Sequence, residues 1–266
     1  MDPKESYNKH SDLYKSYSRA NSDLRANTET YTCFKHLGNL SGLRVLDLGC
    51  GDGSNVFKAS ECGAEELVGV DISESMVQKA IAGAKQLSLD TKCRFYTGDC
   101  LSFESVKSLL GDCKFDAVMS FYLVPYATSI EELLEYFRIC EHFLKEEGLA
   151  FSVCSNPALV RNLPLIQSYL KHMEILPLEP QNNLEKVVIK FYGEDSESFE
   201  VHNTIFSMED FQSATNQTNL ELLKASSLEA NPSAPLDPDE AAVQTELWGK
   251  GFFLLHKKPF FVNNVT

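Results

Sequence analysis

The sequence predicts an α/β fold built on a doubly wound, mostly parallel sheet of seven strands. Between residues 43 and 154, short apolar runs alternate with amphipathic helical patterns. This alternation is typical of an open parallel sheet with helices on both faces. One of the runs ends in a glycine-rich turn at residues 49–53 that opens a helix. Beyond residue 155, apolar runs joined by short turns predict antiparallel pairing instead.

The strands predicted in the first half are near-continuous apolar runs, which suits strands that are buried on both faces of a parallel sheet. They span residues 43–48, 67–70, 93–96, 115–120 and 148–154. A helix follows Ser73, and the clearest helix begins at Ser129, where Ser129 and Glu132 form an S-x-x-E capping box before an apolar stripe. Such helices provide the crossovers that parallel strands need.

The second half predicts a cover for the sheet. Prolines at 157, 164, 177 and 180 interrupt a stretch that we expect to be mostly helical, and two strand-like runs then form an antiparallel hairpin over residues 184–206. A helix near 208–215 and two last strands at 220–226 and 251–256 complete the sheet.

We therefore expect a single domain over residues 1–266. Residues 1–40 form helices over the ligand site, and residues 41–155 form the ligand-binding half. Residues 156–215 form the hairpin cover as an insertion, and residues 216–266 hold the last two strands.

Composition places the chain among ordinary globular proteins. It has 266 residues, of which 43% are hydrophobic, and this content excludes a disordered chain. There is no run of about 18 apolar residues and no signal-peptide pattern, which predicts no membrane partner. The eight cysteines form no C-x-x-C pair and no zinc spacing, so we expect reduced thiols, no metal and a cytoplasmic location.

The formal net charge is −14, and twelve acidic residues with a single lysine lie within residues 194–246. This segment is either a solvated acidic face or an acidic cover that favours neutral or cationic substrates. A surface of this sign repels phosphate backbones, so no nucleic-acid partner is expected. The sequence is silent on the oligomeric state.

The most informative stretch runs from Val45 to Gly53, V-L-D-L-G-C-G-D-G. A buried strand that leads into glycines lets backbone amides approach a ligand at the carboxyl end of the sheet. Dinucleotide sites use G-x-G-x-x-G, whereas here the third glycine comes one residue early and Asp52 lies inside the turn. An NAD-dependent reductase therefore fits poorly.

Acidic residues decide which nucleotide is bound. Asp71 and Asp99 end the second and third predicted strands, and Asp47 lies inside the first. Asp71 can accept hydrogen bonds from a ribose, Asp99 from an adenine amino group, and Asp47 can order the turn or face an ammonium group through water. Each could instead cap a helix or loop. Together they suit S-adenosyl-L-methionine, which carries a sulfonium, an ammonium and no phosphate.

These segments resemble motifs I to IV of the class I S-adenosylmethionine-dependent methyltransferases, namely residues 45–53, 68–73, 98–100 and 115–120. The resemblance implies a Rossmann-like methyltransferase fold and roles for individual residues. Gly49, Cys50 and Gly51 would contact the methionyl part of the cofactor, and Asp71 would hold the ribose. Ile72, Met76, Asp99 and Cys100 would surround the adenine, while Ser120 and Phe121 would border the transferred methyl group.

A narrower similarity covers most of the chain. The N-terminal tyrosines, the segment FYLVPYA at residues 121–127 and the hairpin resemble small-molecule methyltransferases of the toxoflavin-synthase type. It implies that Tyr14 and Tyr17 close the cofactor site. The chain departs from that pattern at Val124-Pro125, where an Asn-Tyr pair is more usual, which leaves the substrate open.

His202, on the predicted cover, and Tyr126, after the fourth strand, are the candidate catalytic residues. Histidine is the usual base near neutral pH, although a surface or packed histidine is the plainer interpretation; Tyr126 could equally be a core aromatic. Pro125-Tyr126 is similar to the Pro-Pro-Tyr of amino-group DNA methyltransferases, but it lies several residues late.

The predicted function is methyl transfer to nitrogen or oxygen of a small-molecule acceptor by in-line displacement. Such a reaction needs a general base only if the nucleophile begins protonated, so the sequence need not contain a recognisable catalytic base. Two alternatives remain open at this point. One is a methyltransferase that acts on a protein or peptide docked on the acidic segment, and the other is a non-catalytic cofactor-binding module.

Overall fold

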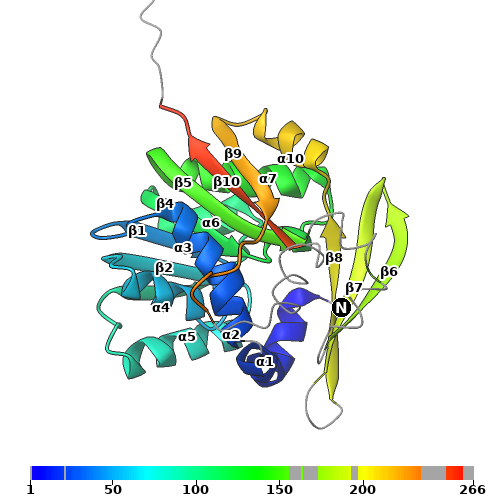
Figure 1. Ribbon diagram of the computed structural model, residues 1–266, viewed down its shortest axis with the longest axis horizontal. Coiled ribbons are helices and arrows are strands. Elements are labelled where there is room, and N and C mark those ends of the chain that lie inside the picture. Colours follow the sequence, from blue (N-terminus) through cyan, green and yellow to red (C-terminus); the bar gives the residue numbers. More distant parts are fainter. Residues whose placement is uncertain are drawn as a thin grey trace, which may run out of the picture.

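The computed structural model describes residues 2–20, 22–155, 163, 173–192, 197–234 and 250–259. Its main sheet has seven strands in the order β3-β2-β1-β4-β5-β10-β9 (Figure 1). Strands β1 to β5 pair in parallel, whereas β10 runs antiparallel to both of its neighbours. The strands are β1 (Arg44–Leu48), β2 (Glu66–Asp71), β3 (Cys93–Thr97), β4 (Phe115–Phe121), β5 (Leu144–Ser155), β9 (Leu220–Ser227) and β10 (Lys250–Lys257).

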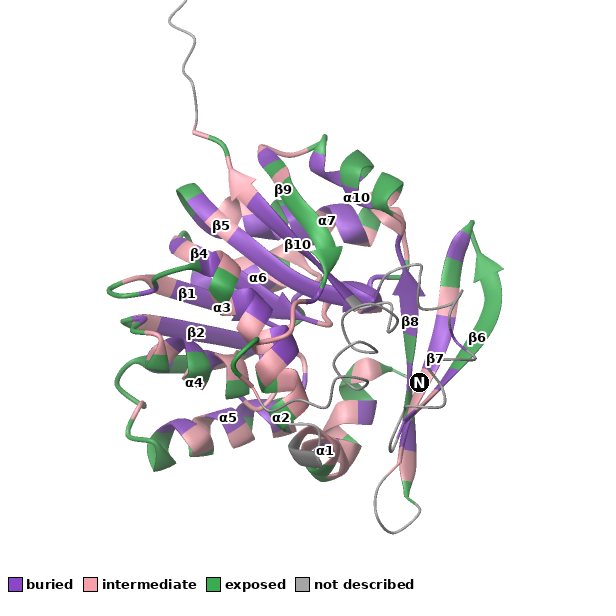
Figure 2. Cartoon of the chain, in the orientation of Figure 1, coloured by how far each residue is buried: buried purple, intermediate pink, exposed green. Residues whose placement is uncertain are grey.

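Helices cover both faces of this sheet, and the central strands are buried between them (Figure 2). One face packs against α6 (Phe103–Leu110), α7 (Ile130–Phe143) and α10 (Met208–Thr215). The other face packs against α3 (Tyr31–Leu37), α4 (Ser54–Glu61) and α5 (Glu74–Gln86). The predicted fold class, a doubly wound and mostly parallel seven-stranded sheet, is confirmed; the division of one domain into four segments stays a prediction.

A second, antiparallel sheet stands beside the first, with the order β6-β7-β8 (Figure 1). Its strands are β6 (Met173–Gln181), β7 (Leu184–Tyr192) and β8 (Ser198–Ile205). The predicted hairpin corresponds to β7 and β8, but the expectation of a mostly helical stretch is wrong for β6. The rest of that stretch lies outside the described residues, apart from Leu163.

Strand β6 was missed because Pro177 and Pro180 lie inside it. Proline cannot donate to a β-ladder, but an edge strand tolerates it, and β6 is the edge of the second sheet. Asn182 and Asn183 connect β6 to β7 with φ values of 52° and 64°. Two residues of positive φ between apolar runs form a tight hairpin turn. The Asn182-Asn183 pair is therefore the sequence signal that could have predicted the β6–β7 hairpin.

The N-terminal part of the chain is helical. Its helices are α1 (Pro3–Ala20), α2 (Ser22–Arg25) and a π-helical turn, η1 (Ala26–Thr30), which leads into α3. Helix α1 lies between α5 and the second sheet and therefore bridges the two sheets (Figure 1). On the α5 side, the Asn8 side-chain oxygen accepts hydrogen bonds from Ser73 Oγ at 2.8 Å and from Ser75 N at 3.2 Å.

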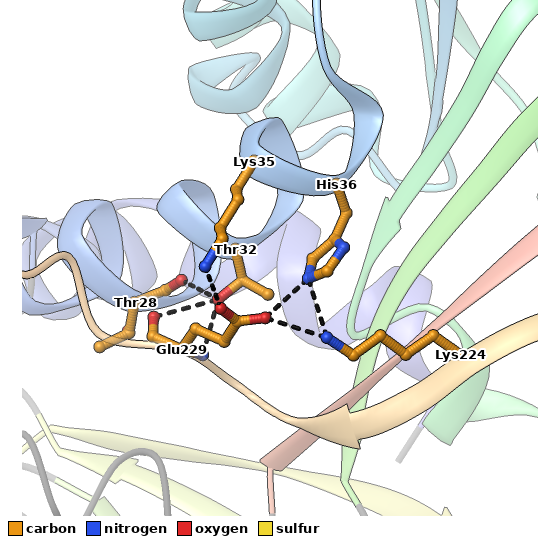
Figure 3. A network of polar contacts seen from close by, with 6 residues as sticks. All are labelled: Thr28, Thr32, Lys35, His36, Lys224 and Glu229. Carbon is orange, nitrogen blue, oxygen red and sulfur yellow. Dashed lines mark hydrogen bonds and ion pairs between the residues drawn. The ribbon is translucent and has the colours of Figure 1, made fainter.

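The chain that leaves β9 is tied to the N-terminal helices through Glu229 (Figure 3). The Glu229 carboxylate pairs with Lys35, with His36 at 2.7 Å and with Lys224 at 3.2 Å. The Glu229 N–H donates to Thr32 Oγ1 at 2.8 Å. Hydrogen bonds from Lys35 and then from His36 lower the pKa of Glu229 to about 2. This clamp therefore stays charged at neutral pH and holds the helices in place.

One predicted cap differs in detail. Ser129 accepts a hydrogen bond from Glu132 N at 3.3 Å, as expected, but the Glu132 carboxylate accepts from Thr128 N at 2.6 Å rather than from Ser129 N. A complete capping box occurs instead at the start of α10, between Ser207 and Asp210.

All eight cysteines are free thiols. Among the described residues, no helix combines the length and the apolar character that crossing a membrane requires.

Candidate active site

A cavity of about 340 Å³ lies where the carboxyl ends of β1, β2 and β4 meet helix α1. Strand β1 has β2 on one side and β4 on the other, so this is the point where the strand order reverses. In open α/β sheets, ligands bind at such a point, and the cavity volume is within the usual range for small ligands.

The glycine turn after β1 forms one wall of this cavity. Gly49 and Gly51 line it with φ values of 76° and 54°, a region that favours glycine. The amides of Gly49 and Cys50 donate to the carbonyl oxygen of Val70 at 2.8 and 3.0 Å, which ties the turn to β2. A Cβ on Gly51 would lie 3.4 Å from the Met76 methyl group, so a side chain there would project into the cavity wall.

Asp71 connects the glycine turn to the start of α5. One carboxylate oxygen accepts from Gly51 N at 2.8 Å, and the other accepts from Ser73 N at 2.9 Å. Burial raises the pKa of Asp71, and these two backbone hydrogen bonds act against that rise. Each oxygen keeps a second lone pair, so Asp71 can accept two further hydrogen bonds from a ligand in the cavity.

Asp47 is buried behind the turn. Its side chain is 1% exposed, and among the described residues neither carboxylate oxygen has a hydrogen-bond partner. Burial and, after it, the neighbouring Asp71 raise the pKa of Asp47 well above its usual range. A buried carboxyl group without a partner is costly, so this group marks a position where a ligand or water can contribute a donor.

The structure brings most of the predicted cofactor residues to this cavity. Its lining includes Tyr14, Gly49, Gly51, Asp71, Ile72, Met76, Asp99, Cys100 and Phe121. Asp47 and Cys50 are not part of the lining; Cys50 packs against Gly69 behind the turn.

Ser120 is directed elsewhere, because its hydroxyl bonds Tyr136 and Ser152 at 2.9 Å in the core. Tyr17 lines a neighbouring cavity. The role of all these residues toward a cofactor stays a prediction.

The two predicted catalytic residues differ in their placement. Tyr126 lines the cavity, whereas His202 does not. The side chain of His202 is 51% exposed, and its Nε2 lies 4.0 Å from the carboxylate of Glu200. The next residue, Asn203, is only 5% exposed. Successive residues of a strand face opposite sides, so Asn203 points inward and His202 outward. The structure therefore does not bring His202 to the site.

A second, smaller cavity of about 70 Å³ adjoins the first. Tyr7, Tyr14, Tyr122 and Tyr126 line both cavities and therefore form the boundary between them. The hydroxyl oxygens of Tyr7 and Tyr126 lie 2.6 Å apart. Burial raises the pKa of both groups, so both hydroxyls are protonated at neutral pH.

An ion pair between Arg25, whose side chain is 20% exposed, and the buried Glu29 lies at the second cavity. Arg25 Nε donates to Glu29 at 3.0 Å, and the hydroxyl of Tyr122 donates to the other Glu29 oxygen. Burial opposes the charge on Arg25, but Glu29 raises its pKa well above the usual value. Tyr122 follows β4 with a φ of 61°, which is uncommon and strained for a residue other than glycine. The pair therefore fixes a strained tyrosine at the boundary of the two cavities.

Sequence reasoning missed several of these residues as site candidates, among them Tyr7, Arg25, Glu29, Tyr122 and Asn203. Two signals were available. Tyr122 belongs to the segment FYLVPYA, and Arg25 and Glu29 have the i,i+4 spacing of an ion pair on a helix. Neither pattern indicates by itself that the pair is buried at a cavity.

A family model described as a methyltransferase domain matches residues 39–189, more than half of the chain. The chain therefore belongs to the methyltransferase domain family. Its fold is also that of an S-adenosylmethionine-dependent methyltransferase from Clostridium acetobutylicum, with 18% identity, coverage of 95% of this chain and 99% of the other, and a TM-score of 0.64.

The S-adenosylmethionine-bound amino pentose methyltransferase CalS10 from Micromonospora echinaspora gives a TM-score of 0.61 at 15% identity, with 92% of this chain and 97% of CalS10 covered. The predicted enzyme class and its cofactor, S-adenosyl-L-methionine, are confirmed at the level of family and fold. The narrower similarity to the toxoflavin-synthase type stays a prediction.

Sequence relatives match only in part. The mRNA cap guanine-N(7) methyltransferase of Schizosaccharomyces pombe is 36% identical over 90 residues, 33% of this chain and 25% of that protein. The ubiquinone biosynthesis O-methyltransferase of Roseobacter denitrificans is 32% identical over 114 residues, 43% of this chain and 41% of that protein. The chain thus spans a quarter to two fifths of the length of these relatives.

The expected partners, a small-molecule acceptor and no nucleic acid, need correction. Several relatives are named for RNA: the mRNA cap enzyme above and the 23S rRNA (uracil(1939)-C(5))-methyltransferase of Shewanella halifaxensis, 31% identical over 150 residues, 55% of this chain and 31% of that protein. The exclusion drawn from the charge of −14 is therefore wrong. Net charge governs non-specific attraction to a phosphate backbone, whereas a single base taken out of its stack is recognised inside a pocket.

Proposed function

We propose that this chain transfers the methyl group of S-adenosyl-L-methionine to a nitrogen or oxygen atom of an acceptor by in-line displacement. One observation carries the proposal. The cavity at the strand ends, with the glycine turn, Asp71 and Asp99 in its lining, adjoins a second cavity across a boundary of tyrosines.

The residues present fit this cofactor. The carboxylate of Asp71 keeps lone pairs for the two hydroxyls of a ribose, and Gly49 and Gly51 leave the wall free of side chains. Ile72, Met76 and Cys100 provide an apolar surface for a base. The carboxyl of Asp47, which has no partner among the described residues, would be satisfied by an ammonium group reached through water.

When bound, the cofactor supplies a methyl group on a sulfonium, which is a good leaving group. The protein contributes mainly by holding the reactants in line, which can account for about 7–11 kcal/mol of the barrier. Tyr7 and Tyr126 hold their protons at neutral pH, so they orient an acceptor by hydrogen bonds rather than act as bases. A nitrogen or oxygen nucleophile with an accessible lone pair fits such a site.

Isotope transfer tests the proposal. The full chain is incubated with S-adenosyl-L-methionine carrying a deuterated methyl group and a cell extract, and the RNA, peptide and metabolite fractions are analysed by mass spectrometry. We expect one fraction to gain the labelled methyl group. Gly51→Val, which fills the cavity wall, is the matched control and should give no label while its circular dichroism stays that of a folded chain.

The same experiment distinguishes the alternatives. Label in a peptide would support the hypothesis of a methyltransferase that acts on a protein or peptide. Binding of the cofactor by calorimetry without label in any fraction would support a non-catalytic module. No heat of binding at micromolar protein and sub-millimolar cofactor would contradict the whole proposal.

A further inference from the structure

The second cavity is placed to hold the acceptor, an inference that rests on the proposed function. Tyr7, Tyr14, Tyr122 and Tyr126 line both cavities, so a group in the second cavity is a neighbour of the first across these side chains. Tyr7 and Tyr126 are joined by their hydroxyls, at 2.6 Å, and therefore act as one fixed unit at the boundary.

One side of the second cavity is apolar. Met173, Ile175, Ile189, Phe191 and Val201 face it from the inner side of the second sheet. Of these, Ile175 and Val201 are 3% and 2% exposed, so they belong to the packed core of the sheet. Such a wall favours the flat or aliphatic face of a ligand and disfavours a hydrated ion.

The other side is polar. Arg25, Glu29 and Tyr122 line it, and Asn203 adds one polar side chain on the sheet side, two residues from Val201. Arg25 donates to Glu29 and to Ser18, at 2.9 Å, and also interacts with Tyr14, so a guanidinium with five N–H donors still keeps capacity for a ligand. The guanidinium and the carboxylate neutralise each other, so the cavity favours a neutral ligand that accepts hydrogen bonds over a free ion.

We infer that the second cavity binds a flat ring that carries oxygen on one edge, with the ring faces against the second sheet and the oxygen toward Arg25. A cavity of about 70 Å³ suits one such ring and disfavours a bulky aliphatic ligand. This ring chemistry is shared by the oxo-bearing bases of nucleic acids and by phenols. The lining of the cavity selects for this ring chemistry, and the experiment below distinguishes between a nucleic-acid base and a phenol as its source.

Ligand-observed NMR on the full chain, saturated with S-adenosylhomocysteine, tests the inference. The probes are uridine and guanosine for a nucleic-acid source and catechol for a phenolic source, with cyclohexylamine as a non-planar cationic comparison. We expect at least one of the oxygen-bearing rings to bind and cyclohexylamine not to bind.

Two variants locate the probe. Val201→Phe fills the cavity from the apolar side, and the double variant Arg25→Met with Glu29→Gln removes both charges together, so that no unpaired charge is left buried. Each should weaken binding of the ring at least about tenfold while the affinity for S-adenosylhomocysteine stays within about twofold. Arg138→Gln, at a half-exposed arginine on α7, is the control and should change neither.

The outcomes separate this inference from the proposed function. A chain that binds the cofactor but none of the three rings, or that binds them equally well in all variants, overturns the inference and leaves the function standing. Binding of cyclohexylamine in place of the rings also overturns it. Loss of S-adenosylhomocysteine binding by the unaltered chain would instead contradict the proposed function.

Discussion

The two sides of the site are built by different means. On the side of the main sheet, the cavity is formed by turns at neighbouring strand ends, with residues such as Gly49, Asp71 and Asp99 that lie within a few positions of a strand. On the side of the second sheet, the cavity is formed by side chains from α1, η1, β6, β7 and β8, which are far apart in the sequence. The first arrangement follows from local patterns, whereas the second exists only after the chain has folded.

This difference leads to separable effects of substitution. Changes at the strand ends should alter cofactor affinity, changes at the tyrosine boundary should alter turnover, and changes at the clamp on α3 should alter stability alone.

The largest expected effect comes from Asp71→Ala. The substitution removes a carboxylate that accepts hydrogen bonds from two backbone amides and keeps lone pairs for the ligand. Each hydrogen bond to such a charged group is worth about 1.5–3 kcal/mol. Loss of two ligand bonds would weaken S-adenosyl-L-methionine binding about 100- to 20,000-fold, measured by calorimetry. Asp90→Ala, at an exposed residue outside the cavity, is the control. Unchanged affinity would mean that Asp71 does not hold the ribose.

Asp47→Asn should change how stability depends on pH. The pKa of Asp47 is raised in the folded state, so the folded chain keeps a proton that the unfolded chain releases. Stability therefore falls as pH rises from the unfolded pKa toward the folded pKa, by about 1.4 kcal/mol per pH unit. Asparagine does not titrate. In urea unfolding without cofactor between pH 5 and 8, the free energy of unfolding of the variant should rise relative to that of the unaltered chain as pH rises. A pH-independent difference would show that Asp47 does not titrate in this way.

Tyr126→Phe should slow the reaction without affecting the cofactor. It removes the hydroxyl that contacts Tyr7 at the boundary of the two cavities. A hydrogen bond that orients the acceptor predicts a decrease in kcat of about 10- to 100-fold and cofactor affinity within about twofold. Tyr96→Phe, on β3 outside both cavities, is the control. An equal loss in both variants would point to a general effect on folding.

The smallest effect is expected at the clamp. Glu229→Gln removes one carboxylate from a network with Lys35, His36 and Lys224, which should cost about 1 kcal/mol of unfolding free energy at pH 7. The pKa of Glu229 is lowered to about 2 in the folded state, so its contribution is present above the unfolded pKa and is lost as pH falls toward 2. Denaturant unfolding at pH 7 and pH 3 measures this, with Glu179→Gln on exposed β6 as the control. If the difference in unfolding free energy between Glu229→Gln and the unaltered chain were as large at pH 3 as at pH 7, the stabilising role given to the Glu229 carboxylate would be wrong.

Most of the main sheet could be predicted because its signals are local. An apolar run, a glycine turn and an acidic residue at the next strand end define the position of Gly49, Gly51 and Asp71 with little freedom, since parallel strands align their carboxyl ends. The resemblance to a methyltransferase followed from the same residues.

Predictions failed where a shift of one residue decides which face of a strand a side chain takes. They also failed where the position of a strand in its sheet outweighs the intrinsic propensity of its residues. His202 and Asn203 are neighbours on β8, and only the register of the second sheet determines which of them points inward. Ser120 follows the expected strand, but its hydroxyl bonds Tyr136 and Ser152 rather than facing the cavity. The prolines of β6 indicate a break by propensity, yet the edge of a sheet accommodates them.

Local sequence patterns are enough to specify the class of fold, the glycine turn and the carboxylates at the strand ends, because each depends on residues close together in the chain. The gathering of Arg25, Glu29, Tyr122 and Asn203 around one cavity beside the first depends on how distant parts of the chain pack. These residues come from η1 and its neighbour α2, from the end of β4 and from β8, and contacts of such sequence separation depend on how α1 and the second sheet pack, which no local pattern specifies.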